Sequence, residues 1–362
     1  MIVAFGELML RLAPPGVLRL RQALPGQLEA TFAGAEANVC AALAAWGMPV
    51  RYVTALPRHT VADAALALLA GLGIDVRYVL RREAGRMGAY FVETGANQRS
   101  SQVLYDRDHS AISLATAEEY LFDEALTGAA YLHVTGITPA LSRAAFDATL
   151  GVVRRAAERG LSVSCDLNFR AKLWRWQPGS SPRELARECM PQILKHVSLL
   201  LANEEDAADV LDISARGTSV EQGRICASAY QEVAERIARR FPNIRRVAFT
   251  LRESHSADHN NWGGLLYEAA TGETFLAPLD GQGEYRPYEI RDIVDRVGAG
   301  DSFAAGLLFA SLTPELAEPR TALRYAVAAS CLKHSVRGDF LYVSREEVEA
   351  LMAGQASGRV RR

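Results

Sequence analysis

Short apolar segments with strand-like composition alternate with longer helical segments along most of this 362-residue chain, and no other feature constrains its fold as much. Parallel strands need a crossover between them, and a helix usually provides it. The alternation therefore predicts an α/β fold, a doubly wound, mostly parallel sheet with helices on both faces. The expected strands cover residues 2–5, 50–56, 76–80, 130–134, 161–166, 198–201, 247–251 and 290–297, and the expected helices cover 35–46, 61–72, 143–159, 183–196, 225–240, 301–312, 320–335 and a last helix that follows Ser344.

Two segments interrupt this alternation. Residues 8–32 contain several prolines and glycines, which indicate an extended excursion rather than core. In residues 85–113, polar and apolar side chains alternate on both sides of the turn Gly95-Ala96-Asn97, which is the pattern of a β-hairpin. The two segments together predict a small β-sheet lid over a cleft, inserted in a single domain that spans residues 1–362.

Composition excludes several classes of function. Apolar residues make up 49% of the chain, which allows a substantial core, and the net charge of −2 gives no reason to expect nucleic acid or an anionic membrane as partner. The five cysteines are scattered without a CxxC pair, which argues against a disulfide framework or a zinc site and favours a reducing compartment. No apolar stretch reaches the length of a bilayer span, so we expect a cytoplasmic protein.

The segment DRVGAGDSF, residues 295–303, carries the strongest chemical signal. A glycine turn at a helix start leaves backbone N–H groups unpaired, and with the helix dipole these groups form an anion site. Asp301 lies inside this site, where a carboxylate is unfavourable beside phosphate unless it takes a proton from an attacking hydroxyl. This combination indicates phosphoryl transfer to an alcohol. The alternative is that Asp301 caps the helix, and the turn alone does not decide between the two.

Other polar clusters follow predicted strands, where open α/β sheets bind their ligands. They comprise residues 33–38, 166–170, 203–206 and 250–252. Each has an ordinary alternative: a helix cap for 33–38, a surface charge for Arg170, acidic residues that complement a helix dipole for 203–206, and a solvent-exposed Arg252. The chain contains no GxxxxGK[ST] motif and no GxGxxG after a strand, which argues against a P-loop or a dinucleotide site.

In their order and spacing, these motifs resemble the ribokinase-like (PfkB-type) carbohydrate kinases over nearly the whole chain. DRVGAGDSF is similar to the signature of that family, DLNFR to a segment of its fructokinase and 2-keto-3-deoxygluconate kinase branches, and YFVETG…VLYDR to the substrate-facing lid of the latter. The resemblance implies that Asp301 is the catalytic base, that Gly298, Ala299 and Gly300 form the anion hole, and that Arg170 lies between the sugar and the γ-phosphate.

The resemblance also implies roles for residues outside the turn. Ala33 replaces the first glycine of the family's sugar-binding pair, and Asp206 replaces the glutamate of an NxxE motif that orders magnesium. The residues implied to bind the sugar are Gly34, Asn38, Tyr90, Tyr105, Arg107, Arg170, Asp301 and Asp339; those implied to bind ATP are Asn168, Asn203, Thr250, Arg252, Gly298, Gly300 and Ser330; Asp206 is implied to act indirectly on Mg²⁺, and Asp295 on a monovalent cation such as K⁺.

The expected function is ATP-dependent phosphorylation of the terminal hydroxyl of 2-keto-3-deoxygluconate, with Mg²⁺ as cofactor. A fructokinase or another ketose kinase of the same fold is the alternative enzyme. A catalytically silent sugar or nucleotide sensor is the alternative from another class, and the intact GAGD turn argues against it. The lid of this family often forms a dimer surface, so a homodimer or higher homo-oligomer is a further expectation.

Overall fold

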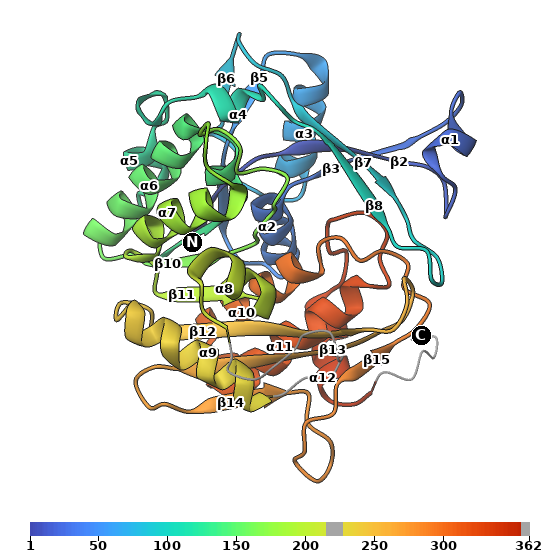
Figure 1. Ribbon diagram of the computed structural model, residues 1–362, viewed down its shortest axis with the longest axis vertical. Helices are drawn as coiled ribbons and strands as arrows, with labels where there is room; N and C mark the ends of the chain where they lie inside the picture. The colour runs from blue at the N-terminus through green and yellow to red at the C-terminus, as the bar shows by residue number, and fades with distance from the viewer. Residues whose placement is uncertain (215–226, 356–362) are drawn as a thin grey trace.

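The computed structural model describes residues 1–214 and 227–355, and a nine-stranded sheet forms its centre (Figure 1). Along the sheet the order is β14-β13-β12-β11-β10-β9-β1-β4, and β15 also pairs with β13. The strands from β12 to β4 are parallel, whereas β13, β14 and β15 pair antiparallel. The strands are β1 (Ile2–Phe5), β4 (Val50–Val53), β9 (Tyr131–Thr135), β10 (Ser162–Asp166), β11 (Leu199–Ala202), β12 (Arg246–Ser254), β13 (Asn260–Glu268), β14 (Thr274–Ala277) and β15 (Tyr288–Ile290).

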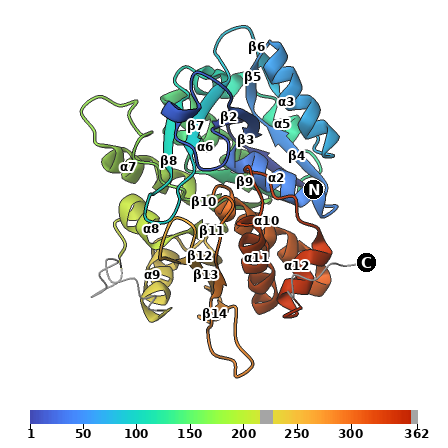
Figure 2. The same cartoon turned by 90° about the vertical axis from the view of Figure 1, so that its right-hand side faces the viewer.

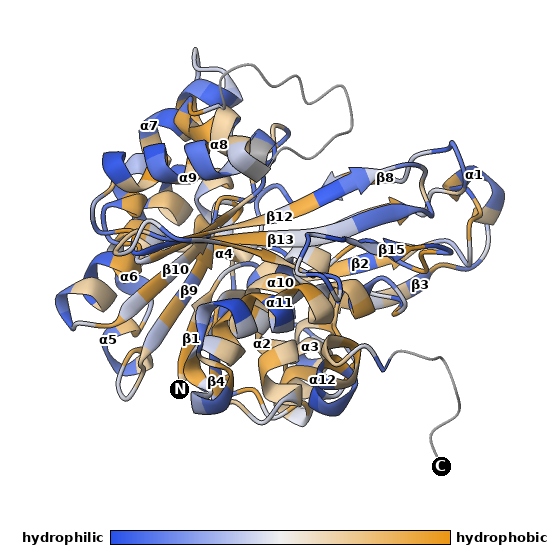
Figure 3. Ribbon diagram, turned by 90° about the horizontal axis from the view of Figure 1, so that it is seen from below, coloured by the Kyte–Doolittle hydropathy of each residue, from blue (hydrophilic) through white to orange (hydrophobic). Residues whose placement is uncertain are grey.

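Helices cover both faces of this sheet, as β1 shows at the level of single residues. Successive side chains of a strand point to opposite faces, and accordingly Ile2 and Ala4 pack in one core while Val3 and Phe5 pack in the other. Figures 2 and 3 show α8 and α9 on one side of the strands and α10, α11 and α12 on the other. The first core is formed with α2 (Ala35–Ala45), α3 (Thr60–Gly71), α10 (Ala299–Leu312), α11 (Pro319–Lys333) and α12 (Arg345–Met352); the second with α4 (Ala111–Leu114), α5 (Phe122–Ala125), α6 (Arg143–Glu158), α7 (Pro182–Leu194), α8 (Glu204–Leu211) and α9 (Ala227–Arg240).

A separate four-stranded sheet, which we call the lid sheet, projects beyond the main sheet (Figure 3). Its order is β3-β2-β7-β8, with β2 and β7 parallel and the two outer pairs antiparallel. At its tip, Asn97 accepts a 2.7 Å hydrogen bond from the N–H of Ala257, which lies between β12 and β13. The elements are β2 (Met9–Ala13), α1 (Leu20–Ala23), β3 (Glu29–Ala33), β7 (Gly88–Glu93) and β8 (Gln102–Asp106).

The strand order reverses between β1 and β9, because the chain runs from β1 to β4 on one side and from β9 to β12 on the other. In doubly wound sheets such a reversal opens a crevice at the carboxyl ends of the strands. Both α2 and α10 begin at this edge, and the lid sheet extends from it. The predicted fold class, a doubly wound and mostly parallel sheet with a small β lid, is thus confirmed.

Two predicted strands were wrong. Residues 76–79 form a turn, and only Leu80 of that segment enters a strand, β6 (Leu80–Arg82), which pairs with β5 (Ala55–Pro57) outside the main sheet. Residues 291–297 run irregularly into α10, and strand structure is confined to β15. Apolar β-branched residues gave both segments a strand-like composition, but neither has a neighbouring strand to pair with.

The predicted helices agree with the structure to within a few residues, including the capping box of Ser344 and Glu347 at α12, whereas α1, α4, α5 and α8 were not predicted. The first two residues of the predicted helix 225–240 lie outside the described residues. Among residues 1–214 and 227–355, no helix is both long and apolar enough to cross a bilayer.

Candidate active site

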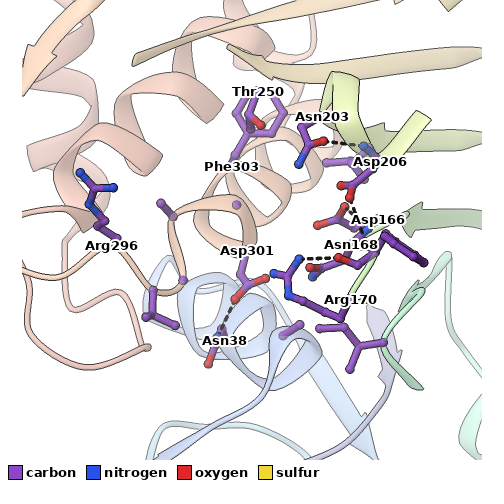
Figure 4. A pocket seen from close by; sticks show the side chains of 18 of the residues that line it. Asn38, Asp166, Asn168, Arg170, Asn203, Asp206, Thr250, Arg296, Asp301 and Phe303 are labelled. Carbon is purple, nitrogen blue, oxygen red and sulfur yellow. Dashed lines mark hydrogen bonds between the residues drawn. The ribbon is translucent and has the colours of Figure 1, made fainter. Parts of the chain in front are cut away.

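One cavity of about 570 Å³ lies at the carboxyl edge of the main sheet, and side chains of the lid sheet line part of it. Figure 4 shows the part of the cavity around Asp301. Strands β10, β11 and β12, the first turns of α2 and α10, and the lid strands β7 and β8 all contribute side chains to its wall. The site residues predicted from sequence that line it are Gly34, Asn38, Tyr90, Tyr105, Arg107, Asn168, Arg170, Asn203, Asp206, Thr250, Arg252, Gly298, Ala299, Gly300, Asp301 and Asp339.

The glycine turn is built by close packing behind it. Gly298 is the N-cap of α10 and has a left-handed backbone with φ of 87°, which favours glycine. A Cβ there would also overlap the carbonyl group of Asp339 and lie 3.2 Å from Cε of Lys333. The N–H of Ala299 donates to the carbonyl oxygen of Arg296 at 3.4 Å, whereas those of Gly300 and Asp301 have no preceding helical turn to bond them. The turn therefore presents backbone donors and the positive end of the helix dipole to the cavity.

Asp301 does not cap α10, because Gly298 is the N-cap and the Asp301 carboxylate makes no cap hydrogen bond. Its Oδ2 instead accepts a 2.6 Å hydrogen bond from Nδ2 of Asn38 (Figure 4). Burial raises the pKa of Asp301 to about 6, and the hydrogen bond from Asn38 limits that rise. A carboxylate with this pKa is ionised at neutral pH and is still basic enough to accept a proton.

The start of α2 holds Asn38 in position. A Cβ on Gly34 would overlap the carbonyl oxygen of Glu7, so only glycine lets the helix begin this close to β1. The N–H of Gly34 donates to Oδ1 of Asn38 at 3.3 Å, which leaves the amide nitrogen for Asp301. Gly34 and Asn38 thus form part of the wall next to the predicted base.

Arg170 points into the cavity between Asp301 and Asp166 (Figure 4). Within the described part of the chain its guanidinium makes one hydrogen bond, 3.0 Å to the carbonyl oxygen of Phe169, and no ion pair. Asn168 before it has a positive φ of 39°, which turns the chain sharply after β10. An exposed guanidinium beside several carboxylates is suited to bind an anionic ligand bidentately.

The lid residues already have partners within the protein. The hydroxyl group of Tyr90 donates to the carboxylate of Asp339 at 2.7 Å, and Arg107 forms a buried ion pair with Glu7. Nε and Nη2 of Arg107 donate to Oε2 of Glu7, whereas Nη1 makes no hydrogen bond to the residues that the structure describes. The guanidinium also lies over the ring of Tyr105, 5.2 Å from its centroid.

Asp295 does not have the environment predicted for a monovalent cation site. Its Oδ2 forms an ion pair with Arg11 at 2.5 Å and accepts a 3.1 Å hydrogen bond from the N–H of Gly338. Its Oδ1 accepts a hydrogen bond from the N–H of Val297. Arg11 also pairs with Asp339 at 2.5 Å, so its guanidinium bridges the two carboxylates. Donors occupy both oxygens of Asp295, which does not fit a K⁺ ion.

Ser330 also differs from its predicted role at the nucleotide. Its side chain is fully buried, and its hydroxyl group donates to the carbonyl oxygen of Ala299 at 2.6 Å, so it supports the turn from behind. This contact requires α10 and α11 to pack closely. Gly306 allows the close packing, because its absent Cβ would lie 2.7 Å from the backbone of Ala326.

Carboxylates suited to Mg²⁺ line the opposite wall. Asp166 and Asp206 lie side by side there, and burial and their mutual repulsion raise the pKa of Asp166. Oδ1 of Asp206 accepts the N–H of Phe169 at 3.1 Å. No group of three or more potential metal ligands occurs in the described residues. Mg²⁺ commonly binds one or two protein carboxylates together with phosphates and waters, so this pair fits the ion.

Sequence reasoning did not assign functions to several buried charged groups around the cavity. Glu36 is fully buried and accepts hydrogen bonds from the N–H and hydroxyl groups of Thr135, at 3.1 and 2.8 Å. A charged residue within an otherwise apolar segment could have indicated them, because charged residues are rarely buried without a partner. The buried groups are Glu7, Arg11, Glu36 and Lys333; Asp166, which lines the cavity, is partly exposed.

Comparison with known proteins gives three consistent results. A family model described as pfkB family carbohydrate kinase matches residues 1–238 and 269–341. The chain is similar to the 2-dehydro-3-deoxygalactonokinase of Haloferax volcanii, with 31% identity over 99% of this chain and 98% of the relative. It is also similar to the 2-dehydro-3-deoxygluconokinase of Bacillus subtilis, with 27% identity over 76% of this chain and 72% of the relative.

Among solved structures, the 2-dehydro-3-deoxygluconokinase of Thermotoga maritima has 41% identity to this chain and a TM-score of 0.87. The alignment covers 98% of this chain and 99% of the other. A putative 2-keto-3-deoxygluconate kinase from Enterococcus faecalis has 27% identity and a TM-score of 0.82, over 100% of this chain and 98% of the other. The similarity therefore includes both the main sheet and the lid.

Proposed function

Because this chain belongs to the pfkB family of carbohydrate kinases, we propose that it phosphorylates the terminal hydroxyl group of a 2-keto-3-deoxy sugar acid. The first candidate substrate is 2-keto-3-deoxygluconate. The observation that carries the chemistry is Asp301, a carboxylate with a pKa of about 6 in the first turn of α10, facing a cavity under a lid. The names of the similar proteins support the choice of sugar acid.

Asp301 acts as the general base in this proposal. It removes the proton from the terminal hydroxyl group, whose oxygen then attacks the γ-phosphorus of ATP while the bond to the β-γ bridging oxygen breaks. The hydrogen bond from Asn38 holds the carboxylate toward the substrate. Backbone N–H groups of residues 298–300 and the guanidinium of Arg170 stabilise the negative charge on the transferred group.

Kinases of this family use ATP and Mg²⁺. We assign the nucleotide to the part of the cavity lined by Asn203, Thr250 and Arg252. Asp166 and Asp206 would hold the magnesium ion, directly or through water. When bound, Mg²⁺ neutralises charge on the phosphate oxygens and orients them for transfer.

The substrate's carboxylate needs a cation under the lid, because an unpaired buried charge is costly. Arg107 is suited to this task, since it lines the cavity and Glu7 occupies its Nε and Nη2 but not its Nη1. Tyr105 packs against the same guanidinium. A neutral ketose such as fructose would leave this donor without a partner, which argues against the fructokinase alternative.

The galactonate epimer is a second candidate substrate. The relative from Haloferax volcanii, which aligns over 99% of this chain, is a 2-dehydro-3-deoxygalactonokinase. The two sugar acids share the carboxylate, the keto group and the terminal hydroxyl group, and differ only in configuration at one carbon. Arg107 and Asp301 would therefore serve both.

The test is a direct measurement of ADP formation with a panel of substrates: the two 2-keto-3-deoxy sugar acids, fructose, and no sugar. We expect kcat/KM for at least one sugar acid to exceed that for fructose about 100-fold, which corresponds to the cost of about 3 kcal/mol for one buried polar group left unpaired. The ratio between the two acids identifies the epimer. A preference for fructose would contradict the assignment, and binding of a sugar acid without any ADP formation would favour the sensor.

A further inference from the structure

Lys333 is a buried cation directly behind the glycine turn. It is the last residue of α11, its side chain is fully buried, and Cε lies 3.2 Å from the position of a Cβ on Gly298. Its ammonium group donates a 2.9 Å hydrogen bond to the carbonyl oxygen of Val336. A lysine is almost never fully buried without a compensating charge.

The compensating charges belong to the network described above. Burial lowers the pKa of Lys333, and the carboxylates of Asp295 and Asp339, which Arg11 bridges, oppose that lowering. The cluster thus contains two cations and two carboxylates and is neutral as a whole. Without Lys333 it would carry one net negative charge immediately behind a turn that must bind phosphate.

Lys333 also acts on Asp301: burial raises the pKa of that carboxyl group, and the positive charge of Lys333 is one of the influences that oppose the rise. A positive charge at this position favours the ionised form of the base and opposes the negative charge that develops on the transferred group. Electrostatic stabilisation of this kind is effective because the group is already fixed and desolvated before the reaction.

We propose that the ammonium group of Lys333 is a built-in cation behind the phosphate-binding turn, a positioning residue that makes a monovalent metal ion unnecessary there. The donors on both oxygens of Asp295 agree with this proposal. The inference rests on the proposed phosphoryl transfer to an alcohol, and not on which sugar acid is the substrate.

A purely structural alternative exists. Lys333 could serve only to bond the carbonyl oxygen of Val336 beyond the end of α11, as basic residues often do at helix C-termini. In that case its removal would lower stability without a specific effect on turnover. Two substitutions separate the alternatives: Lys333→Met removes the charge and keeps the volume, whereas Lys333→Ala removes both and leaves room for a small cation.

The experiment measures kcat in three buffers, which contain tetramethylammonium, K⁺ or NH₄⁺. ADP is measured directly, because a coupling enzyme could itself respond to the salt. The wild type should have the same kcat in all three, within about twofold. Lys333→Met should lose about 10²-fold in kcat in each buffer, as after loss of one fixed donor at an anion site. Lys333→Ala should lose as much in tetramethylammonium and recover at least about tenfold in K⁺ or NH₄⁺. Lys195→Ala is the matched control, because it removes an exposed lysine at the C-cap of α7.

Thermal unfolding in the same buffers gives a readout that needs no substrate. Ammonium should raise the melting temperature of Lys333→Ala and leave that of the wild type unchanged. Failure of the proposed substrate would appear as an inactive wild type in every buffer, and the melting experiment would still test Lys333. A wild-type kcat for Lys333→Met, tenfold activation of the wild type by K⁺, or no effect of ammonium on Lys333→Ala in either assay would each overturn the inference.

Discussion

Asn38 and Asp301 are 263 positions apart in the sequence, yet Nδ2 of Asn38 lies 2.6 Å from Oδ2 of Asp301. The bond joins the first turns of α2 and α10, two helices that pack side by side on one face of the sheet. It favours the ionised carboxylate and fixes its direction. The amide thus couples the sugar side of the cavity to the residue proposed as the base.

Removing this amide should change the pH dependence of the enzyme. The proposed base works only when ionised, so kcat/KM should fall as the pH drops through about 6, the pKa of Asp301. Asn38→Ala removes a hydrogen bond that lowers this pKa, and the acidic limb of the profile should therefore move to higher pH by roughly one unit. The profile of Gln192→Ala, in which an exposed amide is removed from α7, should match that of the wild type. An unshifted limb in Asn38→Ala would argue against Asp301 as the titrating group.

The role of Asp301 itself is tested by Asp301→Asn. The variant keeps the shape of the side chain, and since Asp301 does not cap α10, the fold and nucleotide binding should remain. Turnover should fall by about 10²–10⁴-fold, the usual contribution of a positioned base. The measurement combines kcat with calorimetric titration of ATP, and Asp147→Asn, on the exposed face of α6, is the control. Near-normal turnover in a folded variant would reject the assignment.

Arg107 should affect stability and specificity through different atoms. Arg107→Ala leaves Glu7 buried without its partner, which should lower the free energy of unfolding by about 3–5 kcal/mol. The same change should reduce kcat/KM for the sugar acid by about 2–4 kcal/mol of transition-state stabilisation, and that for fructose much less.

The double variant Glu7→Gln/Arg107→Ala separates the two effects. It should recover most of the lost stability, because no unpaired buried charge remains, but should recover none of the activity toward the sugar acid. Urea unfolding and kinetics with both sugars provide the measurements. If activity returned together with stability, Arg107 would support the lid and would not contact the substrate's carboxylate.

The parts of the site that could be predicted from sequence are those whose functional groups all belong to one continuous segment of the chain. The turn at residues 298–300 and Asp301 follow from one nonapeptide, because glycine conformation and helix start are local properties. The partners of Arg107 and Asp295 could not be predicted in this way. Glu7 and Arg11 reach them only through the tertiary fold, across 100 and 284 positions, and a single sequence does not report such pairings.

The errors in the fold have a related cause. Strands β13 and β14 were not predicted, because the segment after β12 is rich in Asn, His and Ser and looks like a loop. In the structure β12 and β13 form a long antiparallel pair inside the sheet, and the polar start of β13, residues 260–262, also pairs with β15. Conversely, residues 76–79, which include Val76 and Val79, form a turn. Pairing partners, and not local composition, determine whether such segments become strands.

A last prediction concerns Glu36, whose buried carboxyl group accepts three hydrogen bonds from Thr135 and Thr138 behind the cavity. Burial raises its pKa from 4.5 to about 7. A carboxyl group whose pKa is higher in the folded state binds its proton more tightly there, so its contribution to stability is complete below pH 4.5 and is lost as the pH rises to about 7.

Glu36→Gln replaces this group with one of similar shape that cannot ionise. Relative to the variant, the wild type should lose about 3 kcal/mol of unfolding free energy between pH 4.5 and pH 7, which corresponds to the difference between the two pKa values. Urea unfolding of both proteins across this pH range measures the difference, and the loss should level off above pH 7. Glu273→Gln, in the exposed turn before β14, should show no such trend. A constant difference between wild type and Glu36→Gln would mean that Glu36 is ionised in the folded protein throughout the range, with the threonines stabilising its charge.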